Sequence, residues 1–116
     1  MAYVNLIFTS KLSEEKKELL KNSVGQLITI FPGKSEDWLF VSIEDETKLY
    51  FKGMKAEDSA IIEIKIFGKQ EKDHKDLFTS KLCDFLESEL SIQGQNVFLI
   101  FTEGSDGNWG WNGGLF

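Results

Sequence analysis

Cysteine and proline are scarce in this chain, which contains one residue of each type among 116. A single cysteine can form neither an internal disulfide nor a cysteine-based metal site, so we expect a protein of a reducing compartment, the cytoplasm. Cys83 lies beside Leu82 in a segment that is rich in leucine and phenylalanine. A small buried thiol is therefore a better interpretation of Cys83 than a catalytic nucleophile.

A surplus of positive charge is also missing. The formal net charge is −6 at pH 7 and the isoelectric point is about 4.8, whereas a nucleic-acid partner requires a basic surface for its phosphates. The chain has no basic amino-terminal segment followed by an apolar stretch, and no apolar run approaches the length that spans a bilayer. We therefore expect neither a nucleic-acid partner nor a membrane partner. The sequence carries no signal for a metal or a cofactor, and we expect neither.

What the chain does have is the composition of an ordinary globular protein, with 41% apolar and 28% charged residues. A chain of 116 residues is long enough to bury a sizeable hydrophobic core and short enough to form one domain. We therefore expect a single domain over residues 1–116.

The first part of the chain predicts a strand, a helix and a second strand. Residues 3–8 favour a strand, Ser13 is a candidate helix N-cap, and Pro32 ends the helical pattern. Residues 38–43 are apolar on both faces, which is typical of a buried strand. The predicted helix has a continuous apolar stripe formed by Leu19, Leu20, Val24, Leu27, Ile28 and Phe31.

The second part repeats the same order after a short extended piece at 49–51. The isoleucine-rich segment 60–67 favours a strand that Gly68 closes, and residues 97–101 favour another. Between them, a charged stretch that contains His74, which we expect to be solvated, leads into a helix. The apolar residues of this helix are Leu77, Phe78, Leu82, Phe85, Leu86 and Leu90. The chain is thus a duplicated β-α-β plan with right-handed crossovers.

The predicted helices can cover only one of the two faces of the predicted sheet. Two helices cover one face of a four-stranded sheet, yet three of the four strands carry apolar residues on both faces. Other subunits are the expected cover for the second face, so we predict an oligomer. Glu63 and Lys65 lie on one side of their strand, where we expect them to line a wet channel.

The carboxyl-terminal tail, residues 104–116, combines five glycines with the aromatic residues Trp109, Trp111 and Phe116. Glycine loses backbone entropy on ordering and contributes no packing, so this tail cannot be a helix or a central strand. We expect its rings to pack either on the core of their own chain or on a neighbouring subunit.

Several short motifs together are similar to those of one family. They are AYVNLIF at 2–8, PGK at 32–34, Trp38, FKG at 51–53, FGK at 67–69, SKLCDFLESEL at 80–90 and, most specifically, NWGWNGGLF at 108–116. Along its whole length the chain resembles the tautomerase superfamily, in its macrophage migration inhibitory factor and D-dopachrome tautomerase branch. The resemblance implies an α+β fold, a duplicated β-α-β unit with a four-stranded mixed sheet and two helices on one face. It also implies a homotrimer with pockets at subunit boundaries and keto–enol tautomerisation of aryl pyruvates.

The resemblance also implies site residues, and it is incomplete at the catalytic position. The family base is an amino-terminal proline, whereas the matching residue here is Ala2, whose amine becomes terminal only if Met1 is removed. Lys34 matches the lysine that holds the substrate carboxylate, and Phe67 matches the position of a backbone amide contact. The remaining substrate-binding positions are Phe98, in place of a tyrosine, Ile100, in place of an asparagine, and the aromatic Trp111 and Phe116. The family's cysteine pair is absent from the matching loop AEDSAI.

Taken alone, Lys34 is also explained as a cation near a helix end, and four functions stay open. The first is a tautomerase relative whose activity is weak or lost because Ala2 replaces proline. The second is a working isomerase that uses the Ala2 amine, whose ordinary pKa of about 7.7–8.0 suits proton transfer. The third is a binding or cytokine-like signalling module that holds a small aromatic carboxylate. The fourth is a monomeric ferredoxin-like domain, which shares the order of elements.

Overall fold

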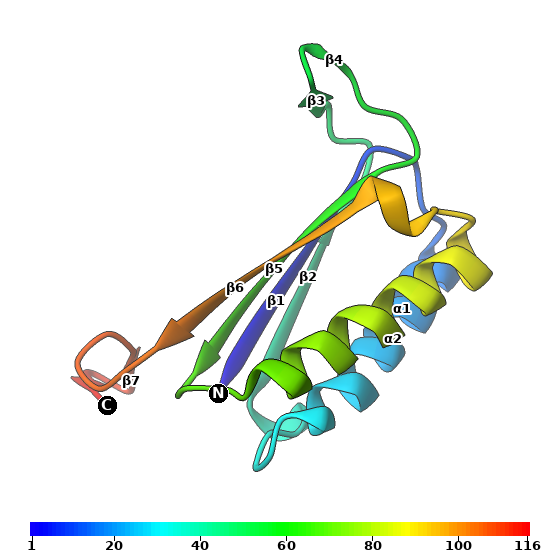
Figure 1. Ribbon diagram of the computed structural model, residues 1–116. Helices are drawn as coiled ribbons and strands as arrows, with labels where there is room; N and C mark the ends of the chain where they lie inside the picture. The colour runs from blue at the N-terminus through cyan, green and yellow to red at the C-terminus, as the bar shows by residue number, and fades with distance from the viewer.

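The computed structural model describes residues 1–116 and shows a four-stranded sheet with two helices on one face (Figure 1). The sheet order is β2-β1-β5-β6, with the pairs β1–β2 and β5–β6 parallel and β1–β5 antiparallel. This mixed sheet confirms the duplicated β-α-β plan and the α+β class. The main elements are β1 (Ala2–Phe8), α1 (Glu14–Leu27), β2 (Leu39–Glu44), β5 (Ala60–Phe67), α2 (Lys72–Leu90) and β6 (Val97–Gly104).

Two small hairpins and three 3₁₀ turns complete the chain. The first hairpin projects from one end of the sheet, and the second follows β6 at the other end, near both termini (Figure 1). None of the helices has the length and apolar character needed to cross a bilayer. The additional elements are η1 (Ile28–Ile30), η2 (Glu36–Trp38), β3 (Tyr50–Phe51), β4 (Met54–Lys55), η3 (Gly94–Asn96), β7 (Gly110–Trp111) and β8 (Gly114–Leu115).

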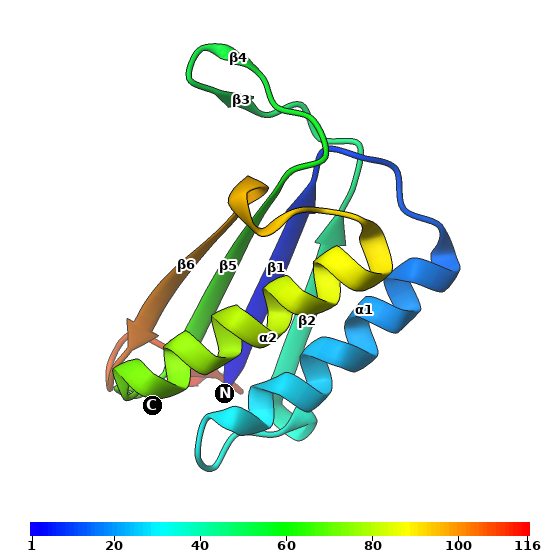
Figure 2. The ribbon, with the colours of Figure 1, turned by 45° about the vertical axis from the view of Figure 1, so that its right-hand side comes forward.

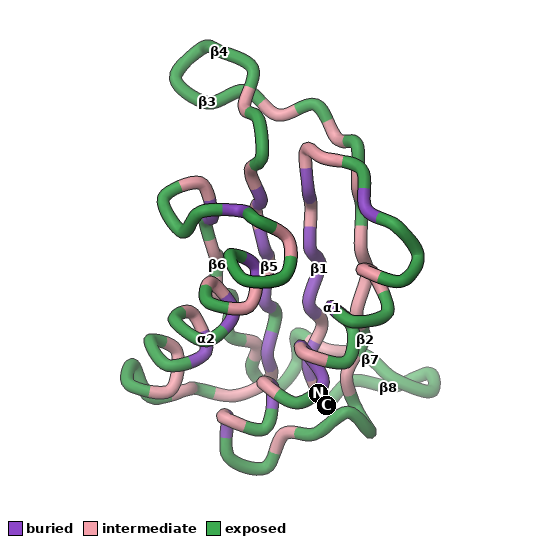
Figure 3. The backbone as a smooth tube through the Cα atoms, turned by 90° about the vertical axis from the view of Figure 1, so that its right-hand side faces the viewer, coloured by how far each residue is buried: buried purple, intermediate pink, exposed green.

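The hydrophobic core lies between the sheet and the two helices, which run side by side on the same face (Figure 2). Alternate residues of the two central strands point into it, and the buried segments in Figure 3 follow β1 and β5. Burial of such side chains stabilises the fold by about 1.5–3 kcal/mol each. The fully buried members include Val4, Leu6, Phe8, Leu20, Val24, Ile62, Ile64, Ile66, Phe78 and Leu82.

The helix α1 begins as predicted and ends earlier than predicted. The Ser13 hydroxyl oxygen accepts a hydrogen bond from the backbone N–H of Lys16 at 3.1 Å, which confirms the N-cap. The α-helix stops at Leu27, the chain tightens into η1, and Phe31 adopts an extended conformation. The reason is Pro32, because a proline ring disfavours helical geometry at the residue before it. Phe31 still reaches the core, where its ring lies 5.4 Å from that of Phe78.

The predicted buried strand at 38–43 is wrong in two respects. Trp38 belongs to the turn η2, which Ser35 caps by accepting a hydrogen bond from the N–H of Asp37 at 3.3 Å. The strand β2 that follows lies at the edge of the sheet, and 67% of the Phe40 surface is exposed. Phe40 pairs with Tyr3 on the face of the sheet opposite to the helices, so no element of the chain covers it (Figure 2).

The helix α2 begins at Lys72, so the charged stretch forms its first turns. Contrary to prediction, His74 is half-buried, and its Nδ1 atom is buried without a hydrogen-bond partner. The cause is helical periodicity, since His74 lies four residues before the buried Phe78 and shares its inward stripe. The helix ends at Ser91 in a left-handed conformation with φ of 57°.

The uncovered face of the sheet carries a hydrogen-bonded polar row in its middle. The side-chain amide of Asn5 donates to Glu44 at 3.0 Å and to Glu63 at 3.3 Å, and its oxygen accepts from the Ser42 hydroxyl at 2.6 Å. Only 7% of Asn5 is exposed. Glu63 and Lys65 share this face, as predicted from their spacing. Around the row lie the exposed apolar residues Phe40, Phe98 and Ile100.

Candidate functional site

Three segments meet at the end of the sheet where β1 begins and β5 ends, which we call the amino-terminal end. The Lys34 ammonium donates a hydrogen bond to the carbonyl oxygen of Phe67 at 2.8 Å, and the N–H of Phe67 donates to the carbonyl oxygen of Met1 at 2.9 Å. The PGK turn directs Lys34 toward β5: Gly33 supplies a positive φ of 80°, and the N–H of Lys34 bonds back to the Phe31 carbonyl. The lysine predicted to bind carboxylate therefore lies beside the start of β1 and the end of β5.

The terminal amine of Met1 lies at this site, and its pKa is lowered, which favours proton transfer. Burial lowers the pKa of the Met1 amine. The positive charge of Lys34 and a hydrogen bond between Lys34 and the amine lower this pKa further. A lower pKa leaves more of the amine neutral near pH 7, and the neutral form is the one that acts as a base or a nucleophile. Ala2, the predicted base, is 2% exposed, and with Met1 present its nitrogen is an amide.

An aromatic cluster adjoins the lysine. The Phe67 ring lies 6.1 Å from the ring of Trp109 and 5.5 Å from that of Phe116, both edge to face. The Lys34 ammonium lies 6.0 Å from the centre of the Phe67 ring. Trp109 packs directly on Gly104, where any Cβ atom would collide with the indole ring. The predicted wall residue Phe116 is thus part of the cluster, together with Trp109.

The tail is held by its own chain through a short hairpin. The N–H of Phe116 bonds to the carbonyl of Trp109 at 2.8 Å, and the N–H of Gly107 bonds to the carbonyl of Phe116. Trp111, another predicted wall residue, lies 5.6 Å from Trp38, and both remain about half exposed. Within the chain, Trp109 and Phe116 pack on Phe67 and Trp111 packs on Trp38. Packing on a neighbouring subunit stays a prediction.

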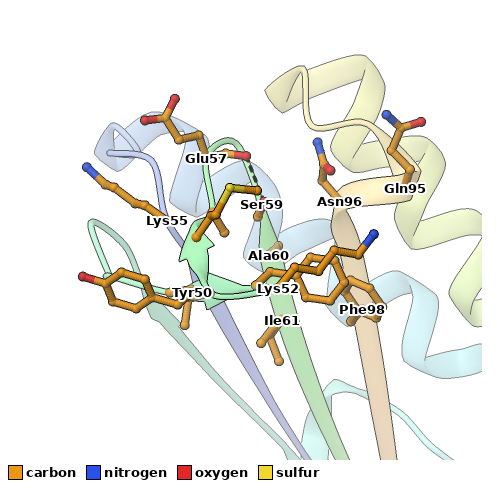
Figure 4. A pocket seen from close by; sticks show the side chains of 14 residues that line it. Tyr50, Lys52, Lys55, Glu57, Ser59, Ala60, Ile61, Gln95, Asn96 and Phe98 are labelled. Carbon is orange, nitrogen blue, oxygen red and sulfur yellow. Dashed lines mark hydrogen bonds between the residues drawn. The ribbon is translucent and has the colours of Figure 1, made fainter.

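The structure does not bring Phe98 and Ile100 to Lys34 within one chain. The parallel register of β5 and β6 places Phe98 opposite Ile61 and Ile100 opposite Glu63, whereas the site lies at the other end of β5. Phe98 instead contacts Phe51 at 5.4 Å and lines a separate cleft of about 280 Å³. Figure 4 shows this cleft, which the hairpin β3–β4 and the start of β6 enclose.

Cys83 has the surroundings of a structural thiol. It is half-buried on α2 beside the core, and burial raises the pKa of its thiol, with the charge of Asp84 adding to the effect. A raised pKa leaves little of the reactive thiolate at neutral pH.

Two features of this site are difficult to predict from the sequence. The carbonyl of Phe67 and the carbonyl of Met1 are backbone acceptors, and no residue type marks a backbone acceptor in a sequence. The pairing of Trp109 with Gly104 has a weak signal, an aromatic residue close to a glycine in the same tail.

Comparison with known proteins identifies relatives along the whole chain. The model of the macrophage migration inhibitory factor family matches residues 3–116. The macrophage migration inhibitory factor of Xenopus tropicalis is 22% identical over 110 residues, which cover 95% of both chains. Among solved structures, Leishmania major MIF2 has a TM-score of 0.85 at 22% identity, covering 100% of this chain and 97% of the other. The asymmetric trimer of wild-type fused 4-OT has a TM-score of 0.84 at 13% identity, with 97% and 94% covered. The likeness to the two structures concerns the fold.

Proposed function

Because this chain belongs to the macrophage migration inhibitory factor family, we propose that it is a relative of the phenylpyruvate and dopachrome tautomerases that isomerises 2-oxo acids weakly. The observation that carries the proposal is the meeting of the terminal amine, the Lys34 ammonium and the backbone of Phe67 at one point. We expect the activity to be weak because a primary amine from Ala2 replaces the proline base.

Each group has a role in a keto–enol transfer. The neutral amine takes a proton from the carbon next to the keto group, and the electron pair of that C–H bond moves to form the enolate. The protonated amine then gives its proton to the enolate oxygen, which forms the enol and restores the neutral amine. Lys34 binds the carboxylate as a point charge. Lys34 lowers the pKa of the Met1 amine, and we expect its positive charge to act in the same direction on the Ala2 amine once Met1 is removed.

Met1 occupies the groups that this reaction would use. Its carbonyl accepts the hydrogen bond of the Phe67 N–H, and its amine lies against Lys34. Removal of Met1 makes the Ala2 nitrogen the terminal amine and frees the Phe67 N–H for a substrate oxygen. The active form is therefore the chain that begins at Ala2.

The proposal includes a homotrimer in the cytoplasm. The uncovered face of the sheet exposes Phe40, Phe98 and Ile100, and a structural relative is a trimer. In such an assembly, Phe98 and Ile100 reach the site of a neighbouring subunit. Neither side chain carries a hydroxyl or an amide, so neither offers the substrate a hydrogen bond.

The test is an enolisation assay on protein whose intact mass shows that Met1 is absent. We expect slow conversion of phenylpyruvate above the buffer rate, and loss of that rate in Lys34→Ala. The same protein with Met1 retained is the control, and we expect it to be inactive. Equal rates for the two forms would contradict the role of the amine.

A binding or cytokine-like signalling module is the second candidate. The absence of proline at position 2 favours it, since Lys34 and the aromatic cluster can hold an acidic aromatic ligand without a strong base. Binding of a 2-oxo acid that depends on Lys34, with no conversion in the protein that begins at Ala2, would favour this candidate.

A further inference from the structure

The Phe67 ring lies where the apolar part of a ligand at Lys34 would be expected. One neighbour is the Lys34 ammonium, 6.0 Å from the ring centre, and the others are the rings of Trp109 and Phe116. These are the partners that an aromatic carboxylate would find at this site: a cation for its charge and aromatic side chains for its ring.

The aromatic slot is the space beside the Lys34 ammonium that Trp109 and Phe116 border. We propose that the Phe67 ring fills this slot, so that the site takes short 2-oxo acids in preference to aryl pyruvates. This inference rests on the proposed carboxylate-binding role of Lys34. The phenyl ring of phenylpyruvate is attached only three carbons from the start of its carboxylate, a span of about 4 Å. With the carboxylate on Lys34, that ring and the Phe67 ring compete for the same volume.

Phe67 is fixed in this position from several sides. Its carbonyl accepts a hydrogen bond from Lys34, and its backbone pairs with Gly104 of β6, so neither of these contacts depends on Met1. Its ring is bounded by Trp109, which itself packs on Gly104. A ligand that displaced the ring would have to break these aromatic contacts. A short acid such as pyruvate needs only the ammonium and the freed N–H.

The experiment compares pyruvate with phenylpyruvate, which differ by the phenyl group, on the full chain that begins at Ala2. In the parent, we expect pyruvate to bind at least about threefold more tightly than phenylpyruvate. In Phe67→Ala, we expect phenylpyruvate to bind at least about tenfold more tightly, because the vacated slot now buries its ring. Pyruvate should change by less than about twofold, since the contact between Lys34 and the carbonyl at position 67 uses the backbone.

Two further variants keep the test decisive. Leu77→Ala removes a side chain of similar size that is 46% exposed on α2, and we expect it to change neither dissociation constant. Phe67→Val makes a smaller opening and replaces Phe67→Ala if that variant does not fold. Both variants at position 67 are compared with the parent by thermal unfolding before binding is measured.

The outcomes separate this inference from the proposed function. Tighter binding of phenylpyruvate than of pyruvate by the parent, or no gain in the position 67 variants, overturns the filled slot while leaving Lys34 as the carboxylate group. Pyruvate binding that survives Lys34→Ala overturns the proposed function, and the position 67 variants still decide whether the ring fills the slot. Failure of both acids to bind every variant overturns both proposals.

Discussion

The two ends of the sheet both place a lysine ammonium near aromatic rings, but they hold it differently. At the amino-terminal end, Lys34 is half-buried and its ammonium bonds to the Phe67 carbonyl at 2.8 Å. At the hairpin end, Lys52 lies 5.5 Å from the centre of the Phe51 ring, and Lys52 and Phe51 are both exposed. The hairpin end has a cleft lined by Phe51 and Phe98, and the amino-terminal end has a lysine ammonium held by a backbone carbonyl.

The difference lies in how the two lysine ammonium groups are ordered: Lys34 has a backbone acceptor, whereas Lys52 lies over an exposed ring. An exposed lysine side chain loses rotamer freedom when it binds a ligand, and water screens its charge. Lys34 is already ordered by a backbone acceptor and lies beside an amine whose pKa it lowers. We therefore assign chemistry to the amino-terminal end and assembly to the hairpin end, and the following predictions test that division.

The largest expected effect is at the amino-terminal end. In protein that begins at residue 2, Ala2→Pro restores a secondary amine as the base and should raise the enolisation rate of 2-oxo acids. One positioned acid–base group contributes about 10²–10⁴-fold, and the missing polar groups of Phe98 and Ile100 keep the variant below a full enzyme. Ala2→Gly, which keeps a primary amine, is the matched control and should show no rise. A Pro variant as slow as the parent would mean that more than the base has been lost.

The next effect concerns assembly through the hairpin end. We expect the parent to sediment as a trimer and Phe98→Glu to sediment as folded monomers. An unpaired charge buried in an interface costs about 3–5 kcal/mol. Leu77→Glu, on the outer surface of α2, is the control and should remain trimeric. A parent that sediments as a monomer at micromolar concentration would contradict the trimer and favour the ferredoxin-like alternative.

A smaller effect is expected when the two lysines are compared directly. Lys34→Ala should weaken pyruvate binding by about 1–3 kcal/mol, the range for loss of a charge-assisted hydrogen bond. Lys52→Ala should change it by less than about 0.5 kcal/mol, as surface substitutions usually do. Titration calorimetry or ligand-detected NMR measures both. Equal losses in the two variants would remove the distinction between the ends.

The smallest effect is a change in titration at the terminal amine. Lys34 lowers the pKa of the Met1 amine, so Lys34→Ala should raise that pKa and reduce the neutral fraction of the amine near pH 7. The rate of acylation of the amine as a function of pH measures this, in protein that retains Met1. Lys52→Ala should leave the profile where it is. A profile that does not move in Lys34→Ala would mean that burial alone perturbs the amine.

The sequence predicted the fold more completely than the site. Segment 60–67 is predicted to the residue because its isoleucines alternate with other residues and Gly68 follows it. Residues 38–43 and His74 were mispredicted, since apolar composition does not distinguish an edge strand from a central one and charged neighbours do not reveal a helix's inward stripe. At the site, a motif identifies Lys34, but its partner is a carbonyl, which every residue has.

The contact between Trp109 and Gly104 links two positions in the evolution of this chain. A side chain at position 104 would occupy the place of the indole ring, so a residue larger than glycine there is compatible only with a smaller residue at position 109. The two positions should therefore change together among relatives. A relative with tryptophan at position 109 should therefore have glycine at position 104. The presence of both residues in a sequence is a marker for relatives that share the packed tail.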